Sequence, residues 1–197
     1  MKTFIHKSII VFILLFASET EANNELKTRW LPDHVKSQFA GNIGFLSIGA
    51  GYSFFKGKIE SDLFYGYVSK ERSQDTIHHI TQKNNYIPFS TPVSKNIIWQ
   101  PISIGTHFSY KIGDNNRQTW LILPNRYPDS YYFSTAFHFL FSLGTSFQYR
   151  GAGIMNNTGF YLEASTVDLY LRNWIRQDYV KMSDTFSLSI GIKKSFY

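Results

Sequence analysis

The sequence predicts an all-β protein, an antiparallel up-and-down transmembrane β-barrel with eight strands. Three observations predict this fold class: long segments in which apolar and polar residues alternate, an unusual composition, and an apolar N-terminal segment. Aromatic residues make up 18% of the 197 residues and charged residues only 17%, whereas charged residues make up about 25% of an ordinary soluble domain. This composition excludes an intrinsically disordered chain, which needs many charges and few aromatic residues.

The N-terminal segment has the three-part order of a secretory signal peptide. A basic start precedes nine consecutive apolar residues at 9–17, and small and polar residues follow. This stretch is too short for a membrane-spanning helix, which needs about 20 apolar residues. We therefore predict that the chain is exported, with residues 1–22 as a cleaved signal peptide. Residues 23–37 are then an N-terminal segment or first strand, and residues 38–197 form the β-barrel domain.

The clearest alternation runs from Phe133 to Arg150. One parity is almost entirely aromatic or aliphatic, and the other is small or polar. Because successive strand residues point to opposite faces, this segment has one apolar and one polar face. It is about three times as long as a typical globular strand. In lipid, strands can span only as a closed barrel, and alternation over about ten residues per pass is the signature of one.

Other segments show the same alternation and bring the number of predicted strands to seven. They are 38–55, 58–69, 76–87, 98–112, 132–150, 158–172 and 184–197. Within the first of them the apolar parity changes, which we interpret as a β-bulge near Phe45. Since bacterial single-chain barrels have an even number of strands, we expect an eighth strand in 25–37.

The predicted connections fall into two groups. Three are short inner turns: Lys56–Gly57, the segment around Pro88 and Pro92, and residues 151–157. Two are long, and we predict them as exposed outer loops, at 113–131 and 172–184. Alternation of short and long connections is typical of a barrel whose turns face one compartment and whose loops face the other.

This pattern resembles that of small bacterial outer-membrane β-barrel proteins, over residues 38–197. The resemblance implies a location in the bacterial outer membrane and contact with outer-membrane lipid and lipopolysaccharide. It also implies that the barrel-assembly machinery reads the C-terminal aromatic pair, Phe196–Tyr197. Tyr and Trp residues near strand ends suit the membrane interfaces; they are Tyr52, Tyr67, Trp99, Tyr110, Tyr149 and Tyr170. We therefore expect a structural or interaction role through the outer loops.

Composition also excludes several classes of function. The absence of Cys excludes disulfides, cysteine metal sites and a thiol nucleophile. The net charge is +6, but the basic residues are scattered and an exported chain rarely meets nucleic acid, so we do not expect it as a partner. Anionic lipid or lipopolysaccharide is the better partner for such charge, and charge that serves solubility alone is an equal alternative. Phosphate-binding, dinucleotide-binding, zinc-protease and serine-hydrolase motifs are missing, and we predict no cofactor and no metal.

The interior of an eight-stranded barrel is filled by side chains or holds one small ligand. We expect the inward polar residues to form a structural hydrogen-bond network without catalytic activity. Its predicted members are Lys58, Glu60, Asp62, His107, Lys111, His138, Arg150 and Glu163.

An alternative hypothesis starts from His107-Phe108-Ser109, where an imidazole and a hydroxyl share one strand face. This resembles the His-x-Ser motif of the outer-membrane lipid A deacylases, also eight-stranded barrels. The resemblance implies a lipid acyl hydrolase with His107 as general base and Ser109 as nucleophile. Three features depart from that family. Tyr110 stands where Asn usually follows the Ser, and 132–150 contains no acidic partner. Those enzymes also place the pair on the lipid-facing surface, whereas here the apolar parity belongs to Phe108.

Two further expectations concern strand pairing and orientation. If the 113–131 loop places Ile112 opposite Phe133, then His107 lies opposite His138. Two histidines across a strand pair could bind a metal, but without an acidic third ligand we interpret them as interior histidines.

The remaining alternative is a soluble exported barrel that binds an apolar ligand, with the aromatic parity lining the cavity and the polar parity facing water.

Overall fold

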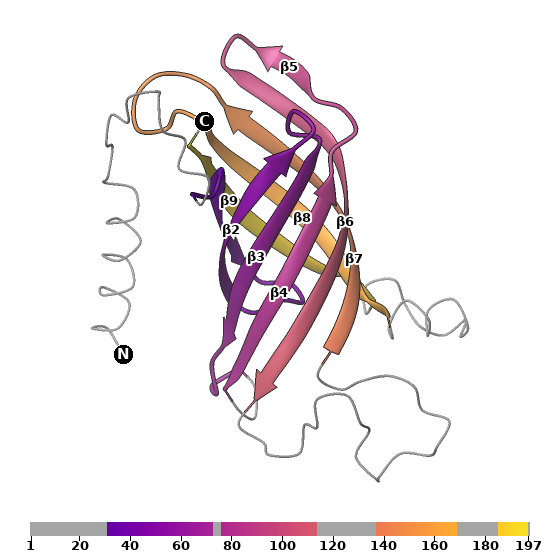
Figure 1. The fold of residues 1–197 in the computed structure, drawn as a ribbon. Coiled ribbons are helices and arrows are strands. Elements are labelled where there is room, and N and C mark those ends of the chain that lie inside the picture. Colours follow the sequence, from indigo (N-terminus) through magenta and orange to yellow (C-terminus); the bar gives the residue numbers. More distant parts are fainter. Residues whose placement is uncertain (1–30, 73–75, 114–136, 169–184, 197) are drawn as a thin grey trace.

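The computed structural model describes residues 31–72, 76–113, 137–168 and 185–196. Within these residues, nine strands form a single antiparallel sheet (Figure 1). They are β1 (His34–Phe39), β2 (Leu46–Phe54), β3 (Ile59–Val68), β4 (Ile77–Tyr86), β5 (Thr91–Ser94), β6 (Ile97–Gly113), β7 (Phe137–Tyr149), β8 (Thr158–Val167) and β9 (Ser187–Ser195). The predicted signal peptide lies outside the described residues.

The sheet closes on itself. Except for β4 and β5, neighbours in sequence pair with one another; β1 also pairs with β9, and β4 pairs with β6. The short β5 forms a hairpin with the start of β6 and takes no part in closure. The other eight strands form an up-and-down barrel, so the prediction of an all-β, antiparallel up-and-down barrel with eight strands is confirmed. No helix in the described residues has the length and hydropathy needed to cross a membrane.

The alternating residues are divided between the lumen and the outer surface as the parity predicts. In β7, Phe137, Phe141 and Phe147 are exposed on the outer surface, whereas Leu140 and Ser142 are buried in the lumen. The alternative in which aromatic residues line the cavity of a soluble barrel is therefore wrong.

The predicted single strand 38–55 is wrong, because this segment contains two strands. Residues 40–45 form a turn between β1 and β2, in which Ala40, Gly41 and Gly44 have positive φ angles of 62°, 90° and 139°. The change of parity near Phe45 therefore marks a chain reversal and not a bulge. The expected eighth strand is β1, which begins within the predicted 25–37 segment but extends beyond it.

The predicted pairing of His107 with His138 is also wrong. His107 lies opposite Leu140, and His138 lies opposite Ser109, so the register differs by two residues from the prediction. The length of a connecting loop does not fix the register of a strand pair.

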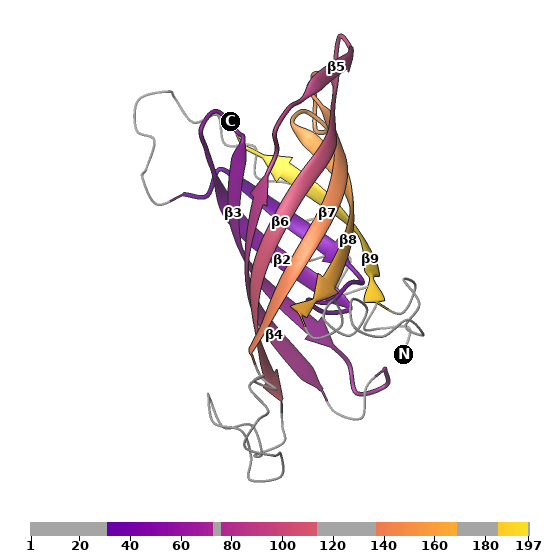
Figure 2. The ribbon, with the colours of Figure 1, turned by 90° about the vertical axis from the view of Figure 1, so that its right-hand side faces the viewer.

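The two ends of the barrel differ. The start of β1, the end of β9, the β2–β3 and β7–β8 turns and the β5 hairpin gather at one end, which we call the terminal end. Figures 1 and 2 show the β5 hairpin projecting beyond the rim there. The predicted 172–184 loop and all of the predicted 113–131 loop except Gly113 lie outside the described residues. At the opposite end of the barrel, β6 and β8 end before these two predicted loops, and β7 and β9 begin after them.

Inward-facing glycines make room for large inward-facing side chains. A Cβ atom at Gly49 would lie 2.7 Å from the ring of Phe64, and one at Gly191 would overlap the ring of Tyr161. Alternation of small and large interior residues is the usual way to fill a narrow barrel. Towards the opposite end, Ile43, Phe64 and Leu140 pack as a small apolar core inside the lumen.

Gly191→Ala is expected to destabilise the barrel by about 1–3 kcal/mol, because the Tyr161 ring must leave its position to admit the methyl group. The free energy of unfolding in urea measures the effect. Gly159→Ala is the matched control, since a Cβ atom there would come no closer than 3.0 Å to its nearest neighbour. In a Tyr161→Leu background the Gly191→Ala penalty should shrink; an unchanged penalty would show that the ring is not its cause.

Candidate functional site

Seven ionisable side chains meet inside the barrel, between the terminal end and the apolar core. This lumen charge network consists of His34 and Lys36 of β1, Glu60 and Asp62 of β3, Lys83 of β4, Glu163 of β8 and Lys193 of β9. Each of these strands contributes its polar parity to the lumen. Charged side chains are almost never fully buried unless they are paired, so their partners determine what the network does.

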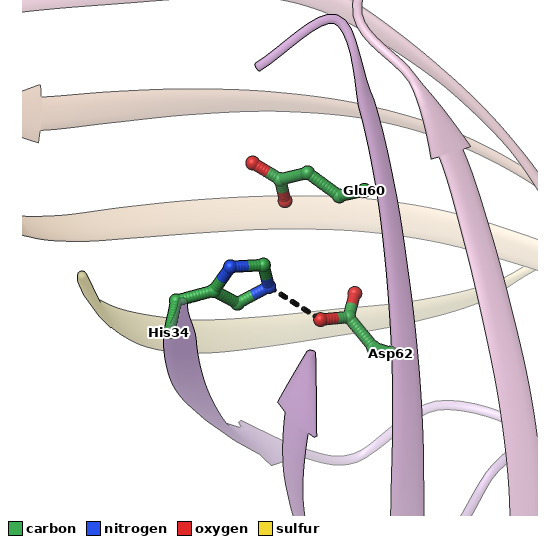
Figure 3. Close-up of side chains that lie close together, drawn as sticks. All are labelled: His34, Glu60 and Asp62. Atoms are coloured by element: carbon green, nitrogen blue, oxygen red, sulfur yellow. Dashed lines mark hydrogen bonds and ion pairs between the residues drawn. The ribbon is translucent and has the colours of Figure 1, made fainter. Parts of the chain in front are cut away.

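The first part of the network joins β1, β3 and β9. The Lys36 ammonium donates to Glu60 Oε2 at 2.7 Å and to Asp62 Oδ2 at 2.6 Å. His34 Nε2 donates to Asp62 Oδ1 at 2.5 Å, the contact drawn in Figure 3. Lys193 pairs with Oε1 of Glu60. Each carboxylate therefore has a separate partner for each of its two oxygens.

The second part of the network crosses the lumen. Lys83 donates to both oxygens of Glu163, at 2.8 Å and 3.0 Å, and to Gln38 Oε1 at 2.9 Å. In the order of the barrel wall, β4 and β8 are separated by β6 and β7. This ion pair therefore connects two strands that are not neighbours in the wall. Both side chains are buried, with exposures of 1% and 6%.

The network is electrically balanced by lysines and carboxylates. Lys36, Lys83 and Lys193 oppose Glu60, Asp62 and Glu163. A buried charge with a hydrogen-bonded partner avoids the large cost of isolated burial. The arrangement fills the lumen and links five strands, and it leaves no carboxylate in it without a cation.

His34, Glu60 and Asp62 also have the residue types of a metal site, with one ligand atom from each lying within 4.8 Å of the others (Figure 3). The Lys36 ammonium, however, already bonds both carboxylates. It supplies the positive charge that a metal ion would supply. The geometry is therefore that of a salt-bridge cluster.

His107 and Ser109 both face the lumen, as their parity predicts, with exposures of 0% and 1%. Within the described residues, their side-chain hydrogen bonds lead to different partners. His107 Nε2 contacts Ser142 Oγ at 3.0 Å and Asn85 Oδ1 at 3.4 Å. Ser109 Oγ contacts Thr81 Oγ1 at 2.8 Å and His79 Nδ1 at 3.4 Å. The catalytic assignment of this pair stays a prediction.

The predicted interior network is partly recovered. Glu60, Asp62 and Glu163 belong to the charge network, whereas Lys58 and Arg150 are exposed at the terminal end. His107 lies in the lumen within a separate, uncharged cluster with Asn85 and Ser142.

The predicted network did not include the three lysines. Lys36 lies in the 25–37 segment, for which we expect a strand but predict no inward-facing residues. Lys83 was overlooked because the outward parity of β4 is itself polar, with Gln82 and Asn84, so no apolar face orients this strand. Lys193 lies near the end of the chain, and the β1–β9 pairing, which alternation within one strand does not specify, places it near Glu60.

The chain was compared with protein-family models, with curated proteins and with solved structures, and none of the three comparisons found a match.

Proposed function

We propose that this protein is a barrel of the bacterial outer membrane, closed to solute flow by its charge network, with a structural or interaction role. The wall of the barrel supports this proposal. Large apolar side chains that are at least 38% exposed occur on every one of the eight barrel strands. A soluble monomer rarely exposes so large a contiguous apolar surface.

The length of the strands and the position of aromatic residues also support a membrane location. β3, β4 and β8 each have 10 residues, which matches the roughly 9–11 residues of a membrane-spanning strand. Exposed Tyr52, Tyr86 and Trp99 lie near the terminal end, and Tyr65 and Tyr67 lie towards the other. Aromatic residues at two levels are typical of the two membrane interfaces.

A polar group on the outer wall is compatible with this location. Ser61, Gln82 and Asn84 face outwards on β3 and β4, where Gln82 donates to Ser61 at 2.7 Å and Ser61 donates to Asn84 at 2.9 Å. Because these side chains bond one another, fewer polar atoms need partners in lipid.

In the proposed orientation, the terminal end faces the periplasm and the predicted loops face outwards, in contact with lipopolysaccharide. Outer-membrane lipid surrounds the wall, and the barrel-assembly machinery reads the C-terminal aromatic residues. The short turns of the terminal end support this orientation. The single observation that carries the proposal is the outward-facing apolar surface around a polar lumen.

Detergent-extracted protein from bacterial outer membranes is expected to migrate faster on a gel before boiling than after it, because a closed barrel resists the detergent until heated. Fractionation of the membranes and gel mobility are the measurements. Recovery of the protein as a monomer in buffer without detergent would contradict the proposal.

A further inference from the structure

A vestibule opens at the terminal end of the barrel, outside the charge network. Its volume is about 390 Å³, within the range of pockets that hold small molecules. The β2–β3 turn, the β4–β5 connection and the end of β7 surround it. Its inner wall includes Lys193 and Glu60, so the charge network lies at its floor.

The lining of the vestibule carries an excess of positive charge. Four basic side chains line it, Lys56, Lys58, Arg150 and Lys193, against two acidic ones, Asp33 and Glu60. Both acids already have partners: Glu60 binds Lys36 and Lys193, and Asp33 accepts the backbone N–H of Ser53 at 2.8 Å. Within the described residues, Lys56, Lys58 and Arg150 pair with no carboxylate.

Backbone hydrogen bonds hold the rim of the vestibule in place. The carbonyl of Lys58 accepts the N–H of Ile87 at 2.7 Å, and the N–H of Arg150 donates to the carbonyl of Asn96 at 2.7 Å. The first bond joins the β2–β3 turn to the end of β4, and the second joins the end of β7 to the β5 hairpin. The basic residues are therefore carried by a rim that is formed before any ligand arrives, which lowers the cost of binding.

Apolar residues also line the vestibule. Ile87, Pro88, Phe89 and Ile98 line it. A ligand that contacts both the basic and the apolar lining residues has an anionic group and an apolar or flat body. The excess of two positive charges matches a dianion, and a phosphate monoester carries about −1.5 to −2 at pH 7.

We propose that the vestibule binds a phosphate monoester attached to an apolar group. Such a group belongs both to soluble phosphorylated molecules and to the headgroup of a phosphatidate lipid. The geometry of the vestibule is independent of the membrane location proposed above, so failure of the binding experiment and failure of that location can be told apart.

The test uses the full chain refolded in detergent micelles, with phenyl phosphate titrated by calorimetry. A second arm adds the protein to phosphatidylcholine vesicles with and without phosphatidate. The Lys58→Gln/Arg150→Gln double variant should lose about tenfold or more in affinity, because two charge-assisted contacts to the phosphate are lost. The matched control is Lys70→Gln/Lys95→Gln, which removes the same charge from residues that do not line the vestibule.

The outcomes separate the two sources of the ligand. A soluble ligand is supported if the wild type and the control variant bind phenyl phosphate equally well and the double variant binds it more weakly. A lipid headgroup is supported if none of the proteins binds phenyl phosphate, and if the double variant binds phosphatidate vesicles more weakly than the wild type and the control variant do. Absence of binding to both probes, or equal affinities for the wild type and the double variant, overturns the proposal.

Discussion

Lys83→Met is expected to destabilise the barrel by about 3–5 kcal/mol, the range for breaking a buried ion pair by removing one partner. Met keeps much of the volume of the side chain but leaves the Glu163 carboxylate in the lumen without the cation that bonds both of its oxygens. It also removes the donor to Gln38. Unfolding in urea, followed by the loss of the fast-migrating gel band, measures the change.

The double variant Lys83→Met/Glu163→Leu separates the charge from the packing. Replacing both partners of a buried ion pair by apolar groups is often neutral or stabilising. We therefore expect it to be more stable than Lys83→Met alone. A double variant as unstable as the sum of the two single variants would mean that the pair does not interact across the lumen.

Leu143→Arg is expected to destabilise the barrel in a lipid bilayer by about 2–4 kcal/mol, the cost of Arg on the lipid face near the midplane. Leu143 lies at the middle of β7 and is 58% exposed on the outer surface. Equilibrium unfolding from phospholipid vesicles measures the effect. On the surface of a water-soluble barrel the same substitution would change the free energy of unfolding by no more than about 0.5 kcal/mol.

Phe55→Arg is the control, because Phe55 is 76% exposed but lies in the β2–β3 turn at the terminal end. Arg near the membrane interface costs about 0–1 kcal/mol. Equal, small effects at the two positions would contradict the proposal that lipid surrounds the wall.

The buried ionisable residues illustrate the limit of prediction from the sequence. The inward direction of Glu60, Asp62 and Glu163 follows from the alternation of their own strands, and the prediction is correct. Their partners do not follow, because Lys83 and Glu163 are 80 residues apart in sequence. The first hairpin shows the same limit, since a change of parity near Phe45 is compatible with a bulge or a turn.

The alternation predicts seven strands, and the eighth follows only from the even strand number of bacterial barrels. The amino-acid sequence by itself determined the class of fold and the face on which each clearly alternating segment carries its rings. These properties are local, because the direction of a side chain in a strand depends only on the two-residue period of the backbone. The tertiary structure alone decided which inward charges meet, which residues face one another across β6 and β7, and that a basic vestibule lies above the charge network. These depend on the register and closure of the whole sheet, which bring distant strands together and which no single segment specifies.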